Sequence, residues 1–423
     1  MVSRTPYSQT VTTAFWIRSI ESIYHGPPAS LPAGESHHGF SLFPPPPSAW
    51  QGIIRTRLLA ATNLNLQDRS DRARKEREDL IGSPDELPDG WSIEGPVPVK
   101  LESDRLQGYF PTPLWVLKAT RDGKASPLPF LALPIEGSWD SASNHPLGDF
   151  VPIGAPKHGR ARAMGGWLSA SDLLRVLDGR VPNPLSDDQW RERRRTWELP
   201  PGAHWETHTG IALEPGEARV REGMLYALKR IRLDWNAGLF GRLHARPAPP
   251  LSFEALRRGT QTGGRKARPF FFEDPPPRHQ DWEAIESGAY LPDKVAENQL
   301  FWLYLSSPIH LKDPARPQFV LPSDIQKDGV EVHVRTALLR PPLWLGGLSI
   351  EQGRSKPNRP HVPAGSGWLI TLRGGDETSR AQALRSLHCR SAFFEPGMNH
   401  ETDATFGKGI TFVGKLPQKG ENK

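Results

Sequence analysis

Cysteine is nearly absent from this sequence, which holds Cys389 alone among 423 residues. A single thiol cannot form an internal disulfide, and it cannot supply the cysteine ligands of a structural zinc site or an iron–sulfur cluster. Long apolar runs are also missing, and the polar segment 1–13 lacks the apolar core of a secretory signal. We therefore expect a cytoplasmic protein that contacts no membrane and carries no cofactor.

The sequence also lacks the motifs of the common catalytic sites. Its glycine-rich segment 404–414 has no P-loop ending, and Phe412 stands where a dinucleotide-binding fingerprint requires its third glycine. No Gly-x-Ser-x-Gly segment occurs. His204 and His208 lie four residues apart, but Glu206 is misplaced for a helical zinc motif, and the segment leads into a predicted strand. We expect neither a catalytic residue nor a metal site.

Proline and glycine are abundant, with 44 and 39 residues and no fixed period, so they separate short elements with many loops. Apolar residues make up 37% of the chain, which is enough for folded cores in about two or three domains. The net charge of +6 gives only a mild preference for acidic partners. Basic residues nevertheless gather in the loop segments 157–162, 265–268 and 354–359, which have few compensating acids.

Periodicity predicts an α+β fold. A capping-box pattern at Ser48 and Gln51 starts a helix that buries Trp50. Further helices are expected from Ser169 to Gly179 and from Ser186, and strands over residues 208–213, 224–233, 330–339 and 367–372. Residues 344–363 are predicted to be a connection too long for an ordinary turn. This order suggests split βαβ units repeated twice, in domains 1–205 and 206–423.

Residues 259–272 have the composition of a nucleic-acid contact. They combine flexible glycines, cations and three phenylalanines, which suit phosphates and unpaired bases. The candidate contacts are Gly263, Gly264, Arg265, Lys266 and Arg268. The alternative is a basic surface loop whose phenylalanines are buried in the core.

A second candidate lies near the C-terminus, where Gly407, Lys408 and Gly409 interrupt a strand pattern. Glycine weakens a strand, so its repeated use predicts that another backbone or a ligand comes close. Lys408 would then be placed to meet a phosphate. The alternative is a tight hairpin in a β-rich domain.

Several segments between residues 43 and 414 occur in an order and spacing that are specific as a set. They are Phe43-Pro44-Pro45-Pro46-Pro47-Ser48 with Gly52 and Arg55; Gly223-Met224-Leu225-Tyr226; Gly263-Gly264-Arg265; Leu345-Gly346-Gly347 with Arg354, Lys356 and Pro357; Val362-Pro363-Ala364-Gly365-Ser366; and the terminal glycine loop. In this order they resemble the RAMP superfamily of CRISPR proteins. Within that superfamily they resemble the type III-B (Cmr) effector subunit that caps the 5-prime tag of the guide RNA.

This resemblance implies two ferredoxin-like (RRM-like) βαββαβ domains with long loop insertions and no catalytic centre. The implied partners are the 5-prime tag of a CRISPR RNA, the large polymerase/cyclase-like subunit and the RAMP backbone subunit of the same complex, with target RNA contacted only indirectly. Carried onto this sequence, the RNA-binding positions are Ser48, Arg55, Gly263, Gly264, Arg265, Lys266, Arg268, Arg354, Lys356, Gly407, Lys408 and Gly409. Arg265 and Arg268 compete for one equivalent role.

Other functions stay open on the sequence. A RAMP-type endoribonuclease that processes the guide precursor would use a loop histidine, His25, His37 or His38, as a general base, although no partner acid is identifiable beside them. The chain could also be the equivalent subunit of a related type III system, or an architectural protein whose basic loops contact neighbouring subunits. Cleavage of a repeat RNA by the isolated chain would distinguish the enzyme from the binding subunit.

Overall fold

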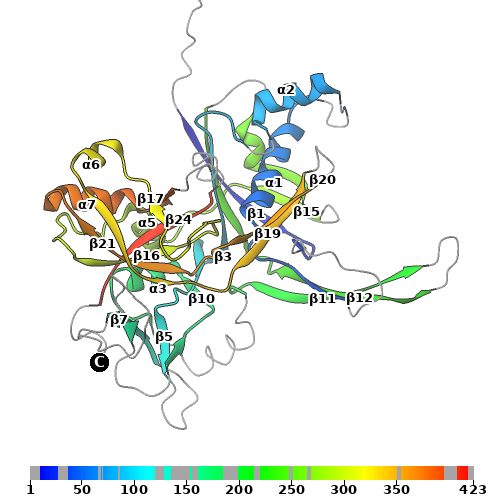
Figure 1. Ribbon diagram of the computed structural model, residues 1–423. Coiled ribbons are helices and arrows are strands. Elements are labelled where there is room, and N and C mark those ends of the chain that lie inside the picture. Colours follow the sequence, from blue (N-terminus) through cyan, green and yellow to red (C-terminus); the bar gives the residue numbers. More distant parts are fainter. Residues whose placement is uncertain are drawn as a thin grey trace, which may run out of the picture.

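The computed structural model describes residues 10–26, 37–64, 68, 70–83, 86–119, 128–134, 153–154, 161–183, 199–213, 220–246, 251–263, 268–349, 354–394 and 407–417. Within these ranges the chain forms mostly antiparallel sheets with short helices, so the α+β class is confirmed (Figure 1). No helix in these ranges is both long and apolar enough to cross a membrane. The helix predicted from Ser186 and most of the basic segment 157–162 lie outside the described residues.

A seven-stranded sheet is built from segments spread along the first two thirds of the chain. Its strands lie in the order β10 (Trp167–Ser169), β4 (Arg105–Pro111), β3 (Ser92–Glu102), β13 (Ala237–Ala245), β1 (Val11–Ser19), β15 (Arg268–Glu273) and β14 (Arg258–Gly263). All neighbours in this sheet are antiparallel. The sheet thus takes strands from both sides of residue 205, and the division into domains 1–205 and 206–423 stays a prediction.

Helix α1 (Pro47–Ala60) packs against this sheet near β14 and β3. The helix starts at Pro47, the last residue of the proline run, with Pro46 as the N-cap, because proline is tolerated in a first turn whose N–H groups have no helical partner. Ser48 lies inside that first turn and makes no capping bond, so the predicted capping box is wrong. Trp50 is fully buried, as predicted, and its ring centroid lies 5.8 Å from that of Phe15 in β1.

A five-stranded sheet occupies the C-terminal part of the chain. Its strands lie in the order β18 (Glu331–Leu338), β21 (Gly367–Arg373), β16 (Leu300–Leu305), β24 (Ile410–Lys415) and β22 (Arg390–Ser391). Helix α6 (Ser323–Lys327) follows β16, and α7 (Glu377–Ser386) follows β21. Strands and helices of this region therefore follow one another along the chain in the order βαββαβ, formed by β16, α6, β18, β21, α7 and β24. The strands predicted over residues 330–339 and 367–372 are confirmed.

The remaining elements are short. Helix α3 (Ala170–Leu177) confirms a prediction, because Ser169 accepts a hydrogen bond from the N–H of Asp172 and the helix ends before Gly179. The others are α2 (Asp71–Ile81), η1 (Phe253–Leu256), α5 (Gln280–Ser287), β5 (Val116–Ala119), β6 (Leu128–Leu131), β7 (Leu133–Pro134), β8 (Ile153–Gly154), β9 (Ala161–Ala163), β17 (Gln318–Phe319) and β23 (Phe393–Phe394).

Two further ribbons extend from the sheets. Strands β11 (Ala203–Leu213) and β12 (Val220–Leu233) form a long antiparallel ribbon that projects from the molecule and also pairs with β2 (His37–Phe40) (Figure 1). Strands β19 (Leu343–Ser349) and β20 (Arg354–His361) form a second hairpin. The prediction of a strandless connection over residues 344–363 is therefore wrong. Among the described residues, β20 pairs with β19 alone, and an edge strand tolerates prolines.

The two large sheets meet at an aromatic interface. Trp115, which follows β4, stacks on Trp302 of β16 with ring centroids 4.6 Å apart and an angle of 2° between the planes. Phe110 of β4 meets Phe412 of β24 edge to face at 5.9 Å. Gly367 makes room for this packing, since a Cβ atom there would lie 2.4 Å from the Trp115 ring. Aromatic pairs of this kind favour one relative placement of the sheets over others.

His388 is buried next to this interface and bridges α5 and β24 in its neutral form. Its Nε2–H donates to the carbonyl oxygen of Ile285 at 2.6 Å, and its Nδ1 accepts from the N–H of Val413 at 3.0 Å. Desolvation by burial lowers the pKa of His388 to about 4. A second proton would also remove the acceptor that the Val413 N–H needs.

We predict that the free energy of unfolding decreases as the pH falls from 6.5 to about 4, the ordinary and folded pKa values of His388. In this window the unfolded chain binds a proton that the folded chain does not, so acidification favours unfolding. Urea unfolding at a series of pH values measures the slope. The His388→Leu variant should lose part of it. Equal slopes in wild type and His388→Leu would contradict this account.

Candidate functional site

A cleft of about 450 Å³ lies where the two large sheets meet. Its walls come from segments that are far apart in the sequence, namely residues 42–47, 94–98, 109–111, 165–167, 240–242, 306–308 and 363–364, together with Leu343, Gly407 and Phe412. Three of the segments that carry the RAMP resemblance therefore converge here: the proline run before α1, Pro363-Ala364 and the terminal glycine loop.

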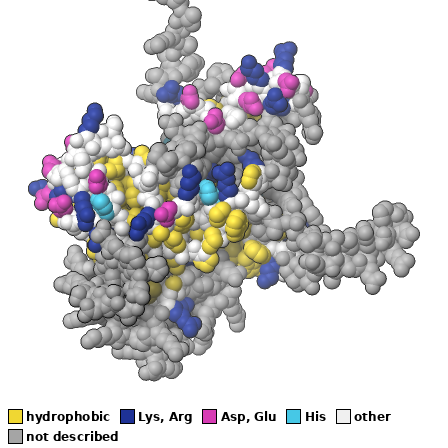
Figure 2. Space-filling model, in the orientation of Figure 1, with side chains coloured by type: hydrophobic (Ala, Val, Ile, Leu, Met, Phe, Trp, Pro, Cys, Tyr) yellow, Lys and Arg dark blue, Asp and Glu magenta, His cyan; other side chains and the backbone are white. Residues whose placement is uncertain are grey.

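The cleft walls are mainly apolar and aromatic. Prolines 44–47, 96, 98, 111, 308 and 363 line them, together with the rings of Phe43, Phe110, Trp167, Phe240, Trp282 and Phe412. Figure 2 shows hydrophobic side chains gathered at the middle of one face of the molecule, with lysine and arginine side chains beside them. Flat apolar walls with few polar groups suit a planar ring such as a nucleobase.

Charged side chains at the wall of the cleft form a network of ion pairs. Arg242 of β13 forms ion pairs with Glu94 of β3, at 3.0 Å from Nε to Oε2, and with Glu286 of α5. Arg278 also binds Glu286, at 2.6 Å from Nη1 to Oε2. Burial would raise the pKa of Glu94, but the hydrogen bond with His244 and the charge of Arg242 hold it below its ordinary value. Two arginines thus face two glutamates, and the network fixes α5 to the sheet.

The guanidinium of Arg340 lines the cleft and is held by a backbone oxygen. Its Nη2 donates to the carbonyl oxygen of Thr112 at 2.7 Å, so it joins the loop after β4 to the segment after β18. Desolvation by burial lowers the pKa of the Arg340 guanidinium, which means that its charged form is held at a cost. An anionic group that entered the cleft would offset this cost.

Gly407 lies close to another part of the backbone, as its sequence context predicts. Its φ is +71°, and a Cβ atom would lie 2.6 Å from the carbonyl oxygen of Ile93 in β3. Gly409 has φ +69°, and its Cβ would lie 2.5 Å from Ile309 Cδ1. The two glycines therefore allow the segment before β24 to pack closely at the cleft. Lys408, between the two glycines, is half-buried. Contact of this loop with a ligand stays a prediction.

Two residues that the resemblance marks for RNA lie in or near the first turns of α1. Ser48 is half-buried and directly follows Pro47, which lines the cleft. Arg55 is only 7% exposed. Its Nη1 donates to Gln51 Oε1 at 2.9 Å, and its Nη2 donates to the carbonyl oxygen of Ser83 at 2.7 Å. Arg55 thus fastens α1 to the loop after α2, which leaves little of the guanidinium accessible to RNA.

The β14–β15 hairpin holds the next set of predicted contacts. Gly263 pairs with Arg268 across the hairpin, and Arg268 forms an ion pair with Glu21. Gly264, Arg265 and Lys266 lie outside the described residues. Phe270 and Phe272 are each 1% exposed, so the alternative in which these rings belong to the core is confirmed for both. They cannot stack on RNA bases.

The predicted positions Arg354 and Lys356 lie on β20, opposite Ser349 and Gly347 of β19. The base of this hairpin reaches the cleft, because Leu343 is part of the lining. The hairpin therefore begins at the cleft, and Arg354 and Lys356 lie toward its other end.

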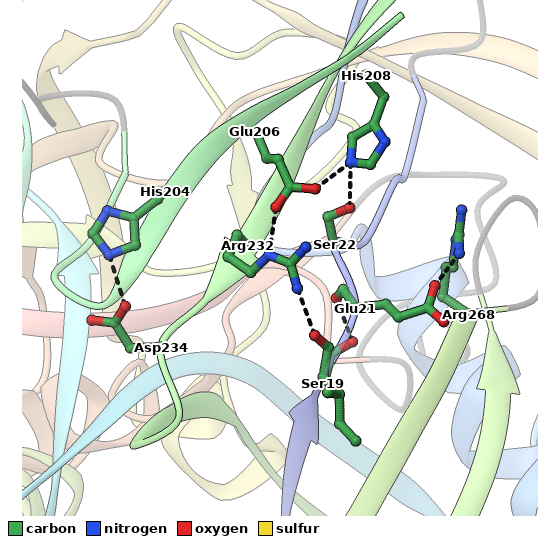
Figure 3. A network of polar contacts seen from close by, with 10 residues as sticks. Ser19, Glu21, Ser22, His204, Glu206, His208, Arg232, Asp234 and Arg268 are labelled. Carbon is green, nitrogen blue, oxygen red and sulfur yellow. Dashed lines mark hydrogen bonds and ion pairs between the residues drawn. The ribbon is translucent and has the colours of Figure 1, made fainter. Parts of the chain in front are cut away.

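The histidines of the β11–β12 ribbon bond to different partners (Figure 3). His204 Nε2 lies 2.9 Å from Asp234 Oδ1, whereas His208 Nε2 lies 3.0 Å from Ser22 Oγ and also contacts Glu206. Glu206 in turn binds Arg232, and this bond is the main reason that the pKa of Glu206 is lowered to about 2. The cluster thus ties the ribbon to the loop after β1, and it does not bring His204 and His208 to one shared ligand.

The loop histidines considered as a general base differ in position. His25 is 6% exposed, and burial lowers its pKa to about 4. His25 therefore lies in a loop as predicted, but its side chain is buried. His37 and His38 lie in β2, and their side chains are outside the described residues.

Sequence reasoning missed the Arg242–Glu286 network and Arg340. The partners Arg242 and Glu286 are 44 residues apart, and only the packing of α5 on the sheet brings them together.

Residues 32–416 match the family model described as CRISPR-associated protein (Cas_Cmr3). The chain therefore belongs to this family, and it is a RAMP-like subunit of a type III CRISPR effector.

No curated protein matches the sequence. One similar solved structure is a chain of the type III-B Cmr-beta complex bound to cognate target RNA and AMPPnP, with 12% identity, coverage of 84% of this chain and 86% of that chain, and a TM-score of 0.40. Another is a chain of the Csm3–Csm4 subcomplex of the type III-A interference complex, with 12% identity, coverage of 87% and 94%, and a TM-score of 0.34.

We predict that Gly407→Val lowers the free energy of unfolding by at least about 2 kcal/mol, because valine is strained at positive φ and its Cβ would meet the Ile93 carbonyl. Lys408→Ala, in the same loop, should change it by less than about 1 kcal/mol. Urea unfolding of the two variants beside wild type makes the comparison. A Gly407→Val protein as stable as wild type would show that the loop does not need this close approach.

Proposed function

We propose that this chain is the type III-B subunit that binds the 5-prime tag of the guide RNA and links the large polymerase/cyclase-like subunit to the RAMP backbone subunits in antiviral defence. The observation that carries the proposal is the convergence of the proline run, Pro363-Ala364 and Gly407 on one cleft. Both halves of the chain are proposed to be ferredoxin-like domains, and the βαββαβ order from β16 to β24 supports this for the C-terminal half.

The lining of the cleft supports a role in holding bases. The lining residue Arg242 is paired with Glu94 and Glu286, and the walls of the cleft are aromatic and proline-rich. Unpaired RNA bases are recognised by such walls, whereas phosphates are held by arginine, lysine and backbone N–H groups. We therefore assign splayed bases to the cleft and phosphates to the basic hairpins β14–β15 and β19–β20.

The proposed subunit holds RNA without cutting it. A general base must reach the 2-prime hydroxyl of its substrate, and His25 is buried away from solvent. His208 is already bonded to Ser22 and Glu206. These arrangements favour a binding subunit over the processing endoribonuclease, and any cleavage by the assembled complex is assigned to neighbouring subunits.

The test is capture of RNA by the purified chain. We expect it to bind single-stranded RNA that begins with the tag more tightly than the same RNA with a scrambled tag. Binding should weaken with salt, by a slope of about −0.7 per phosphate neutralised. The triple variant Arg265→Ala, Lys266→Ala and Arg268→Ala should bind more weakly, with unchanged circular dichroism. Equal affinity for tag and scrambled RNA would contradict tag recognition.

The same preparation decides between binding and cleavage. Labelled repeat RNA should stay intact with or without magnesium. A specific product that disappears in His25→Ala, His37→Ala or His38→Ala would establish the endoribonuclease instead. A product that survives in all three variants would indicate a contaminating nuclease.

A further inference from the structure

Strand β14 is the last strand of the seven-stranded sheet, and among the described residues it pairs with β15 alone. Residues 258–260, at the start of β14, are exposed. The backbone groups of an exposed edge strand can pair with a strand of another chain, and natural proteins protect such edges. We therefore searched the free side of β14 for a feature that would keep other strands away.

Arg57 of α1 occupies this side of β14. Its Nη2 donates to the carbonyl oxygen of Arg258 at 2.6 Å, and its Nη1 donates to that of Thr260 at 3.3 Å. Alternate residues of an antiparallel strand direct their backbone groups to the same side, so these two carbonyl groups point away from β15 together. Arg57 Nε also donates to the carbonyl oxygen of Ala255, just before β14, at 2.8 Å. The guanidinium thus supplies donors where a further strand would place its N–H groups.

Gly259 allows the guanidinium to come this close. Its φ is +118°, and a Cβ atom there would lie 2.1 Å from Arg57 Nη2. Thr262 is the next residue whose carbonyl group faces the free side, and it accepts a hydrogen bond from the side-chain amide of Gln261 at 3.1 Å. Side chains of the same chain therefore bind all three carbonyl groups that β14 directs to its free side.

We propose that Arg57 ends the seven-stranded sheet and keeps a second copy of this chain from pairing with β14. A second copy is the partner that this edge fits, because it presents an identical strand, and two identical edges can pair about a two-fold axis. The guanidinium is suited to this role, since its fork of donors can bind carbonyl groups two residues apart. The inference does not depend on the proposed function, because it concerns the sheet edge and not the cleft.

The experiment is sedimentation velocity of the full-length chain over a series of protein concentrations. The average mass of Arg57→Ala should rise with concentration to about twice the wild-type value, as expected for a dimer. Gly259→Ala should also associate, because its Cβ displaces the guanidinium. Arg57→Lys should associate less than Arg57→Ala, since an ammonium keeps the charge but lacks the fork. Arg72→Ala is the matched control, because the Arg72 side chain on α2 is 89% exposed, and it should behave as wild type.

A proline in β14 locates the association. Proline lacks the N–H group that an added strand needs, so Thr260→Pro in the Arg57→Ala background should return the mass to the wild-type value. Circular dichroism establishes that each variant is folded. If Arg57→Ala does not fold, Arg57→Lys with and without Thr260→Pro makes the same comparison. Folded Arg57 variants with the wild-type mass at every concentration would overturn this inference. Association that persists with Thr260→Pro would also overturn it, because another surface would then be responsible.

Discussion

The stacked pair Trp115–Trp302 fixes how the two large sheets sit against one another, and the cleft exists because of that placement. Phe110 and Phe412 add an edge-to-face contact at the same interface. The cleft walls come from both sides of this aromatic layer, so no single sheet could form them. Separation of the sheets would therefore disperse the residues that converge on the cleft, even if each sheet stayed folded.

The distribution of charge divides the surface into two kinds of contact. Inside the cleft, Arg242 is paired with Glu94 and Glu286, and most of the walls are apolar. Outside it, β20 carries cations without acids. A subunit that holds one fixed RNA end needs both kinds, because pockets distinguish bases whereas cations hold any phosphate. The proposed function follows from this division.

Local patterns predicted the local elements. The serine cap of α3 and the β-forming residues of β18 and β21 are encoded within a few residues, and these elements were confirmed. The β19–β20 hairpin was missed because its glycines and prolines resemble those of a loop, while its hydrogen bonds are satisfied across the pair. The resemblance identified the proline run, but it could not show Arg55 turned inward or Arg242 paired with Glu286, since tertiary packing decides both.

The most direct test of the central claim is photocrosslinking in the assembled complex, with 4-thiouridine at a single position of the 5-prime tag. The account predicts that this nucleotide crosslinks to the chain described here, within residues 43–47 or 363–364 of the cleft lining. Crosslinks from the tag to other subunits alone, with none to these segments, would contradict it.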